Sequence, residues 1–283
     1  MAEMTSTNYQ IRWDSLTEGG SDTSVSENYG IHDSVGGAAQ GNSTSANYQT
    51  DSGYRLGAFD QVITFDPLLE DSSAGVSVTS RSGTTVFTAQ TAGLSTGEAV
   101  VLVQDHGVAQ ISAIGKITSI SSGVSIVVDS WSDNGTTPTI DGINDFLYPM
   151  NSSSITLGEL SKTSVVTAVI GYEVTADLDN GYSVQVMADG GLTTGSHTIT
   201  DVSDGSVTAT SEEYGGRSSD TSIATSTFDT QDTAFSTSFQ DITTESTAKY
   251  KDRHFLTLKA AASDTTPSGN YSQALTIVAS GNF

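Results

Sequence analysis

Alternation of apolar and polar residues between positions 170 and 188 is the clearest structural signal in the chain. The alternation continues on both sides of a polar turn at residues 179–181. A period of two with one polar row is typical of half-buried strands, so this stretch predicts two of them. In a hairpin both apolar rows must share one face, which requires a three-residue loop pairing Leu178 with Tyr182, with Gly181 at positive φ. If the strands enter different sheets, that pairing fails but both rows still face the core.

Shorter runs of the same kind, separated by Gly- and Ser-rich turns, divide the rest of the chain. Six short strands between residues 75 and 150 predict a compact barrel or small sandwich. The strands from residue 153 to the end predict a two-layer sandwich. Between residues 211 and 247 the chain is polar with isolated phenylalanines, which predicts a long surface excursion with room for one edge strand. The predicted strands are 76–79, 84–88, 98–104, 109–113, 116–120 and 125–129, then 154–157, 164–170, 198–202, 206–210, 254–259 and 273–279.

The first 56 residues contain an internal repeat. Its three units share a Ser-x-Asn-Tyr motif, with the asparagines at positions 8, 28 and 47. A period near 20 residues predicts one strand and one turn per unit. One interpretation is a disordered tail, since the segment is poor in apolar residues. The other is a set of strands that pair with this chain's body or with a neighbouring subunit, which the regular placement of apolar side chains favours. Those residues are Tyr9, Ile11, Trp13, Tyr29 and Ile31.

These patterns predict an all-β protein with three parts. Residues 1–70 form an extended N-terminal strand arm, residues 71–150 a small β-barrel or sandwich, and residues 151–283 an antiparallel β-sandwich. Proline and acidic residues near positions 67–73 and a Pro- and Ser-containing stretch at 149–154 mark the two boundaries.

Composition narrows the class of protein. The net charge is −23, with 33 acidic residues against 10 basic ones, which argues against binding to nucleic acid or to anionic membrane surfaces. Cysteine is absent, so disulfides, thiolate catalysis and Cys-ligated zinc are excluded. The chain has no apolar run of about 20 residues that predicts a membrane span, and no signal peptide at its start. Its Ser- and Thr-rich polarity indicates an extracellular or cell-surface protein in its mature form.

The sequence contains no recognisable catalytic motif. The histidines are not spaced as metal-protease ligands, and no nucleophile elbow, phosphate-binding loop or dinucleotide fingerprint occurs. We therefore expect no enzymatic activity and no catalytic residue. Turn and surface positions account for all four histidines, which are His32, His106, His197 and His254.

A loop rich in Asp and Asn between residues 129 and 145 offers the one candidate for a cofactor. Oxygen ligands of this kind suit calcium, and Asp133, Asp141 and Asp145 are the candidates. The spacing does not match an EF-hand, and solvated turns are the alternative interpretation. In the same loop, Trp131 is a candidate platform for a sugar ring.

Several short segments resemble a family. Residues 154–161, 180–184, 212–215 and 274–283 resemble secreted bacterial β-sandwich surface proteins, and the Ser-x-Asn-Tyr repeats resemble the N-terminal segments of similar exported proteins. At the level of architecture the chain also resembles the pilin-like subunits of donor-strand filaments. This resemblance implies a role at the cell surface and no catalytic residues, and it does not cover residues 75–150.

Together these observations predict a structural subunit of an extracellular filament or surface layer. The N-terminal arm adds a strand to a neighbouring subunit's sheet, so the partner is another copy of this chain. Two alternatives stay open: a cell-surface adhesin or carbohydrate-binding module with a glycan ligand, and a phage fibre protein. The expected assembly residues are Tyr9, Ile11 and Trp13, followed by Tyr29 and Ile31.

Overall fold

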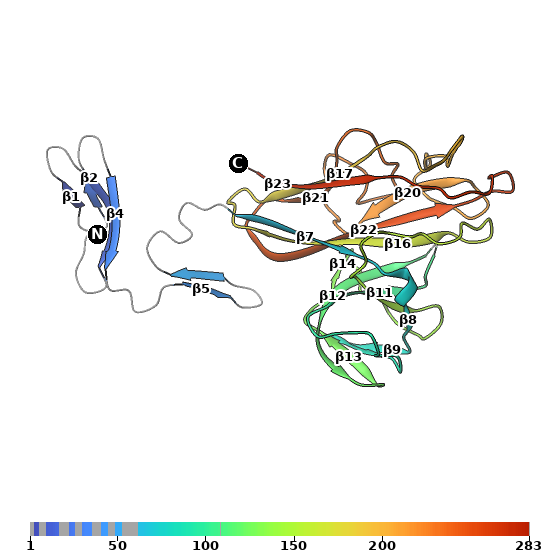
Figure 1. Ribbon diagram of the computed structural model, residues 1–283, viewed down its shortest axis with the longest axis horizontal. Coiled ribbons are helices and arrows are strands. Elements are labelled where there is room, and N and C mark those ends of the chain that lie inside the picture. The colour runs from blue at the N-terminus through green and yellow to red at the C-terminus, as the bar shows by residue number, and fades with distance from the viewer. Residues whose placement is uncertain are drawn as a thin grey trace. The chain divides into compact units, whose positions relative to one another are not determined.

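The structure is a computed structural model of the whole chain. It describes residues 62–107 and 109–282 with their side chains, and N-terminal to them the backbones of six strands between residues 3 and 52. Figure 1 shows an all-β protein, as predicted from the sequence. The chain divides into two compact units, residues 1–62 and residues 63–283.

The N-terminal unit reflects the sequence repeat directly. Each repeat contributes two antiparallel strands instead of the single strand predicted, one on either side of its Asn-Tyr pair. Strands from equivalent positions of the first two repeats then pair in parallel, with Met4 beside Ser24 and Gln10 beside Gly30. At these pairs the offset equals the 20-residue spacing of Asn8 and Asn28, because similar units present similar edges to one another. The strands are β1 (Glu3–Thr5), β2 (Gln10–Leu16), β3 (Thr23–Val25), β4 (Gly30–Val35), β5 (Gly41–Thr44) and β6 (Gln49–Ser52).

The second unit contains an antiparallel sandwich of a four-stranded and a three-stranded sheet (Figure 1). The four-stranded sheet has the order β20-β22-β16-β7 and the three-stranded sheet the order β21-β17-β23. A short hairpin of β18 (Thr193–Thr194) and β19 (His197–Thr198) lies outside both sheets. The sandwich strands are β7 (Ile63–Leu69), β16 (Val166–Ala176), β17 (Tyr182–Ala188), β20 (Glu213–Ser218), β21 (Gln240–Glu245), β22 (Lys249–Ala261) and β23 (Leu275–Gly281).

The prediction of a hairpin between residues 170 and 188 is wrong, but the prediction that the apolar rows of both strands face the core is confirmed. Strands β16 and β17 belong to different sheets, so Leu178 does not pair with Tyr182. Both rows are nevertheless buried in one core, and Gly181 has the predicted positive φ, 71°. The turn carries the chain across the core from one layer to the other. Alternation cannot separate the two arrangements, because in each of them both rows face inward.

The segment 211–247 is not the long surface excursion that its sequence predicts. It supplies two strands, β20 and β21, and two of its three phenylalanines enter the core. Phe228 is fully buried and its ring lies 5.6 Å from that of Phe235, whereas Phe239 is 46% exposed. The predicted strands 154–157 and 206–210 are absent from the structure, and of 198–202 only its first residue falls in a named strand.

A barrel-like sheet is inserted between β7 and β16. Its order is β8-β15-β11-β12-β13-β10-β9, with β14 pairing to β12. The two strands predicted at 109–113 and 116–120 are one continuous strand, since Gly115 is not a turn. A Cβ at Gly115 would lie 2.7 Å from the carbonyl oxygen of Ser130, so glycine here permits close approach of a neighbouring backbone. The strands are β8 (Val76–Ser77), β9 (Ser80–Ser82), β10 (Thr85–Phe87), β11 (Ala99–Gln104), β12 (Ile111–Ser121), β13 (Ser125–Val128), β14 (Ser132–Asp133) and β15 (Phe146–Pro149).

The first boundary also differs from the predicted one at residue 70. Strand β7 lies within the expected arm but pairs with β16 along its whole length, from Ile63 opposite Ala176 to Leu69 opposite Ile170. The chain therefore completes one sandwich strand, forms the barrel, and returns to the sandwich. In the part of the chain that the structure describes, no helix combines the length and the apolarity needed to cross a membrane.

Barrel and sandwich share an apolar core and a group of buried charges. Val101 and Ile114 of the barrel pack with Val169 and Phe255 of the sandwich. Beside them, Glu70 is 3% exposed, and one of its carboxylate oxygens accepts a hydrogen bond from the Val169 backbone N–H at 2.8 Å. Burial, with a smaller contribution from the charge of Asp71, raises the pKa of Glu70 from 4.5 to about 7.

We expect the variant Glu70→Gln to be more stable than the parent protein at pH 8, and about equally stable at pH 4. A raised carboxyl pKa means that the folded state favours the protonated form. The carboxyl group of Glu70 therefore stabilises the fold at pH values below its ordinary pKa. This contribution is lost as the pH rises through its pKa in the folded protein. The loss amounts to about 3 kcal/mol at pH 8. Urea denaturation of both proteins at pH 4, 6 and 8 measures it, and a stability difference that does not change with pH would contradict the assignment.

Candidate functional site

A large apolar groove lies between the two layers of the sandwich. Its volume is about 1250 Å³, above the roughly 300–1,000 Å³ that is typical of small-molecule sites. Apolar side chains of β7 and β23 form its walls, and core residues form its floor. The apolar lining includes Phe65, Leu69, Ile155, Leu157, Leu160, Ile170, Leu192, Leu258, Leu275 and Ile277.

The groove exists because the two layers have unequal width. The four-stranded sheet ends at β7, whereas the three-stranded sheet ends at β23, so one layer is a strand narrower than the other. Inward-facing Leu275 and Ile277 pack against the core but remain only half-buried, while Val278 on the other face of β23 is 40% exposed. In the described part of the chain β23 has one partner, β17, and its second edge is unpaired.

An irregular segment, residues 154–160, lines the groove where a strand was predicted. Its Ile155, Leu157 and Leu160 side chains pack on the core without making a sheet ladder. The rim is polar and holds the exposed ion pair of Lys162 with Asp264. An apolar trough with a polar rim beside a free sheet edge has the features of a site that receives an extended peptide.

The residues proposed as calcium ligands stabilise turns instead of converging on a common point. The carboxylate of Asp145 is 2% exposed and accepts hydrogen bonds from the backbone N–H groups of Asp105, Asp141 and Gly142. Asp141 accepts one from Ile143, and Asp133 accepts others from Gly135 and Thr137. Capping of this kind explains the acidic loop by local structure alone.

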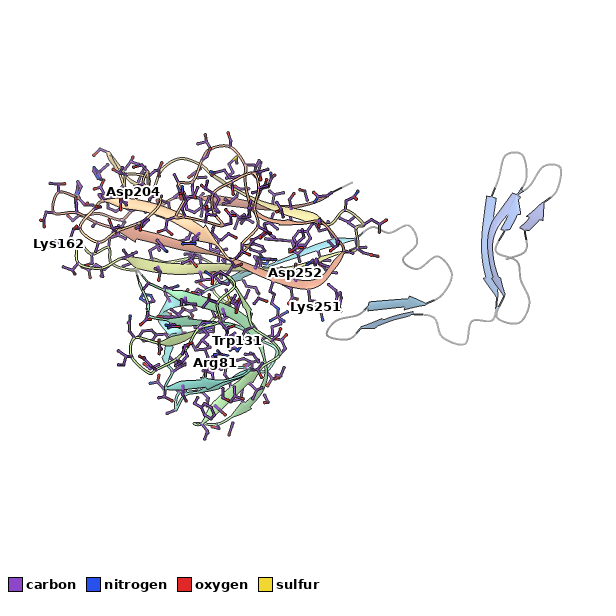
Figure 2. The ribbon with its side chains drawn as sticks, turned by 180° about the vertical axis from the view of Figure 1, so that it is seen from behind. Arg81, Trp131, Lys162, Asp204, Lys251 and Asp252 are labelled. Atoms are coloured by element: carbon purple, nitrogen blue, oxygen red, sulfur yellow. The ribbon has the colours of Figure 1, made fainter. Side chains whose placement is uncertain are left out.

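Trp131 is likewise engaged within the barrel. Its indole N–H donates to the carbonyl oxygen of Gly83 at 3.1 Å, and its ring packs against the barrel core. Arg81 donates to the same carbonyl oxygen, and Figure 2 shows both side chains on the barrel. The polar tip that would orient a bound sugar is therefore already paired.

The five predicted assembly residues lie in the N-terminal unit. Ile11 and Trp13 fall on β2 and Ile31 on β4, so their backbones are extended, and their side chains are outside what the structure describes. Tyr9 and Tyr29 lie outside the described residues altogether.

Three histidines have described side chains, and each has a specific neighbour. His106 lies in a turn as predicted, but it is half-buried beside Phe146 and Tyr148, and this burial lowers its pKa. His197 contacts Glu212 at 2.9 Å. His254 lies between carboxylates at the end of the sandwich.

Sequence reasoning missed the groove. Alternation in residues 275–279 predicts a buried inner row, and nothing local signals that the opposite layer leaves that row partly uncovered. The comparison with family models finds no matching family, and comparisons with curated proteins and with solved structures find no significant match.

Proposed function

We propose that this protein is a structural subunit of an extracellular filament or surface layer, assembled head-to-tail by strand addition. The N-terminal arm of one copy enters the groove between β7 and β23 of the next and pairs with the free edge of β23. A contact of this kind between two different surfaces does not close on itself, so it propagates into a fibre.

The observation that carries the proposal is the free edge of β23 above an uncovered apolar row. An added strand would continue the three-stranded sheet and cover the half-buried Leu275 and Ile277. Backbone hydrogen bonds to β23 provide the pairing, and alternate side chains of the incoming strand fill the groove. Burial of apolar area contributes roughly 25 cal/mol per Å², so the gain comes mainly from the groove.

The arm has a segment that suits this groove in length and in pattern. Strand β2 has seven residues, as does β23. The sequence alternates apolar residues at Tyr9, Ile11 and Trp13, which fits the period of a strand with one face inserted. Within its own unit β2 pairs with β1, β3 and β4, so insertion exchanges one set of backbone hydrogen bonds for another.

Removal of residues 1–62 is expected to abolish polymerisation. The remaining residues, 63–283, form a compact unit by themselves and keep their own core. Negative-stain microscopy and light scattering of both proteins measure the effect: fibres or an oligomer ladder for the full chain, and monomers for the truncated one. Polymers from the truncated protein, or monomers from the full chain at high concentration, would overturn the proposal.

A matched pair of variants tests the groove itself. Ile277→Arg places a charge in the groove and is expected to block assembly, whereas Val278→Arg on the exposed face of the same strand leaves it intact. In case Ile277→Arg misfolds, excess peptide corresponding to residues 8–16 provides a second test, because it should compete for the groove of the unmodified protein. Assembly that neither the variant nor the peptide reduces would exclude this groove as the acceptor.

A further inference from the structure

A second cluster of polar side chains lies where the two sandwich layers meet at the end of β21. Asp252 and His254 are two residues apart on β22, so they share one face of that strand. Glu245 ends β21 in the opposite sheet. The Nε2 atom of His254 lies 3.4 Å from Oδ2 of Asp252 and 3.7 Å from Oε1 of Glu245, and the three ligand atoms all lie within 4.8 Å of one another. Figure 2 labels Asp252 on the sandwich.

These separations match the coordination shell of a small divalent cation. Zinc binds imidazole nitrogen and carboxylate oxygen at about 2.0–2.2 Å, and in a tetrahedron such bonds place neighbouring ligand atoms about 3.4 Å apart. The observed spacing from His254 to both carboxylates is close to this value. The three side chains are partly buried, with 15–25% of each side chain exposed.

The surrounding groups hold the ligands in place. The hydroxyl of Tyr182 donates to the Asp252 carboxylate at 3.0 Å, and the ring of Tyr172 stacks on His254 with centroids 6.3 Å apart. Lys249 contacts the Oε2 atom of Glu245 at 2.9 Å, which leaves Oε1 directed at His254. Such outer contacts orient ligands in metal sites.

The local charge also favours a dication. Two of the three ligands, Glu245 and Asp252, are carboxylates, and one ammonium group, Lys249, contacts them through Glu245. The carboxylates outnumber the ammonium group that contacts them, so a bound cation meets a net negative charge from these groups. Among the described residues, no other group of three histidines or carboxylates has this spacing.

We propose that Glu245, Asp252 and His254 bind one divalent transition-metal ion, with Zn²⁺ as the best fit, and that the ion links the two layers of the sandwich. Its ligands come from both sheets, so binding requires the folded state and stabilises it. The one nitrogen ligand favours zinc over calcium, which prefers six to eight oxygens.

Equilibrium dialysis of the full chain against ZnCl₂ tests the proposal. We expect one Zn²⁺ per chain and a rise of roughly 5 °C in the melting temperature at saturation, reversed by a chelator. His254→Gln should weaken zinc binding more than tenfold. Substoichiometric binding, binding unchanged in His254→Gln, or calcium bound in preference to zinc would overturn it.

His197→Gln is the matched control. His197 also contacts a carboxylate, that of Glu212, but among the described residues it belongs to no set of three. The control variant should retain the zinc stoichiometry and affinity of the parent protein, and an equal loss in both histidine variants would refute the assignment. If His254→Gln fails to fold, visible absorption of the Co²⁺-loaded parent decides the outcome: a tetrahedral spectrum lost on adding one equivalent of Zn²⁺ supports the site, and an octahedral spectrum contradicts it.

Discussion

Replacing Arg253 by Met is expected to lower the free energy of unfolding by about 3–5 kcal/mol, because it removes one cation from a buried group of charges. Arg253 is 9% exposed and lies on the sandwich strand β22, where the sandwich packs against the barrel. Its guanidinium binds Asp129 of the barrel and lies 3.2 Å from the Oε2 atom of Glu173. Glu173 is 4% exposed, and its other oxygen contacts Lys116 at 2.9 Å. Without Arg253, the Oε2 atom has no cation beside it.

The same network predicts how the effect changes with pH. Burial by itself would raise the pKa of Asp129, but hydrogen bonds from Arg253 and from two backbone N–H groups outweigh it and hold the pKa below its ordinary value. A carboxyl group whose pKa is lower in the folded than in the unfolded protein stabilises the fold at pH values above its unfolded-state pKa. This contribution is lost as the pH falls through the folded-state pKa. The difference between the parent protein and Arg253→Met should therefore shrink in acid.

Two further proteins make the measurement specific. The double variant Arg253→Met with Glu173→Met should recover part of the stability, since the buried carboxylate that has lost one of its two cations is gone. Lys162→Met breaks the exposed ion pair with Asp264 and should leave stability unchanged. Urea denaturation followed by circular dichroism compares all four. Exposed ion pairs contribute up to about 1 kcal/mol to the free energy of unfolding. If Arg253→Met lowers that free energy by no more than this amount, Arg253 does not stabilise a buried charge.

Phe228→Ala is expected to lower the free energy of unfolding by about 3–5 kcal/mol, while Phe239→Ala should change it by no more than about 0.5 kcal/mol. Both residues belong to the segment that its sequence predicts to be a surface excursion. Phe228 is fully buried and packs against Phe235, so its removal leaves a cavity in the sandwich core. Phe239 is 46% exposed and leaves none. Denaturant titration of the two variants gives the comparison, and equal losses would show that Phe228 is not a core residue.

Assembly and metal binding are independent proposals. The groove is bounded by β7 and β23, whereas the candidate metal ligands lie on β21 and β22. The protein lacking residues 1–62 should therefore lose polymerisation and keep zinc binding. Each proposal can fail without the other.

The glycines show how far local sequence reasoning extends. Gly181 follows an Asp-Asn pair between two alternating runs, and its positive φ follows from that context. Gly115 stands between two shorter apolar runs and predicts a turn, but it lies within β12. Its role depends on the Ser130 carbonyl oxygen, which is distant in the sequence, so no local pattern reveals it.

The candidate sites divide in the same way. The arm repeat is visible in the sequence, and its period determines how β1 pairs with β3 and β2 with β4. The groove and the metal-ligand set are not visible. The first depends on the unequal width of two layers, and the second on Glu245 of one sheet meeting Asp252 and His254 of the other.

The sequence by itself determined the all-β class, the inward rows of β16 and β17, the repeat of the arm and the conformation of Gly181. These depend on side-chain period and on turn chemistry, which act over a few neighbouring residues. Only the tertiary structure decided that β16 and β17 lie in different sheets, that β7 belongs to the sandwich, and that Phe228 is a core residue. The physical reason is that a strand's hydrogen-bonding edges are the same whichever partner they meet. The choice among partners is made by the burial that the whole chain achieves.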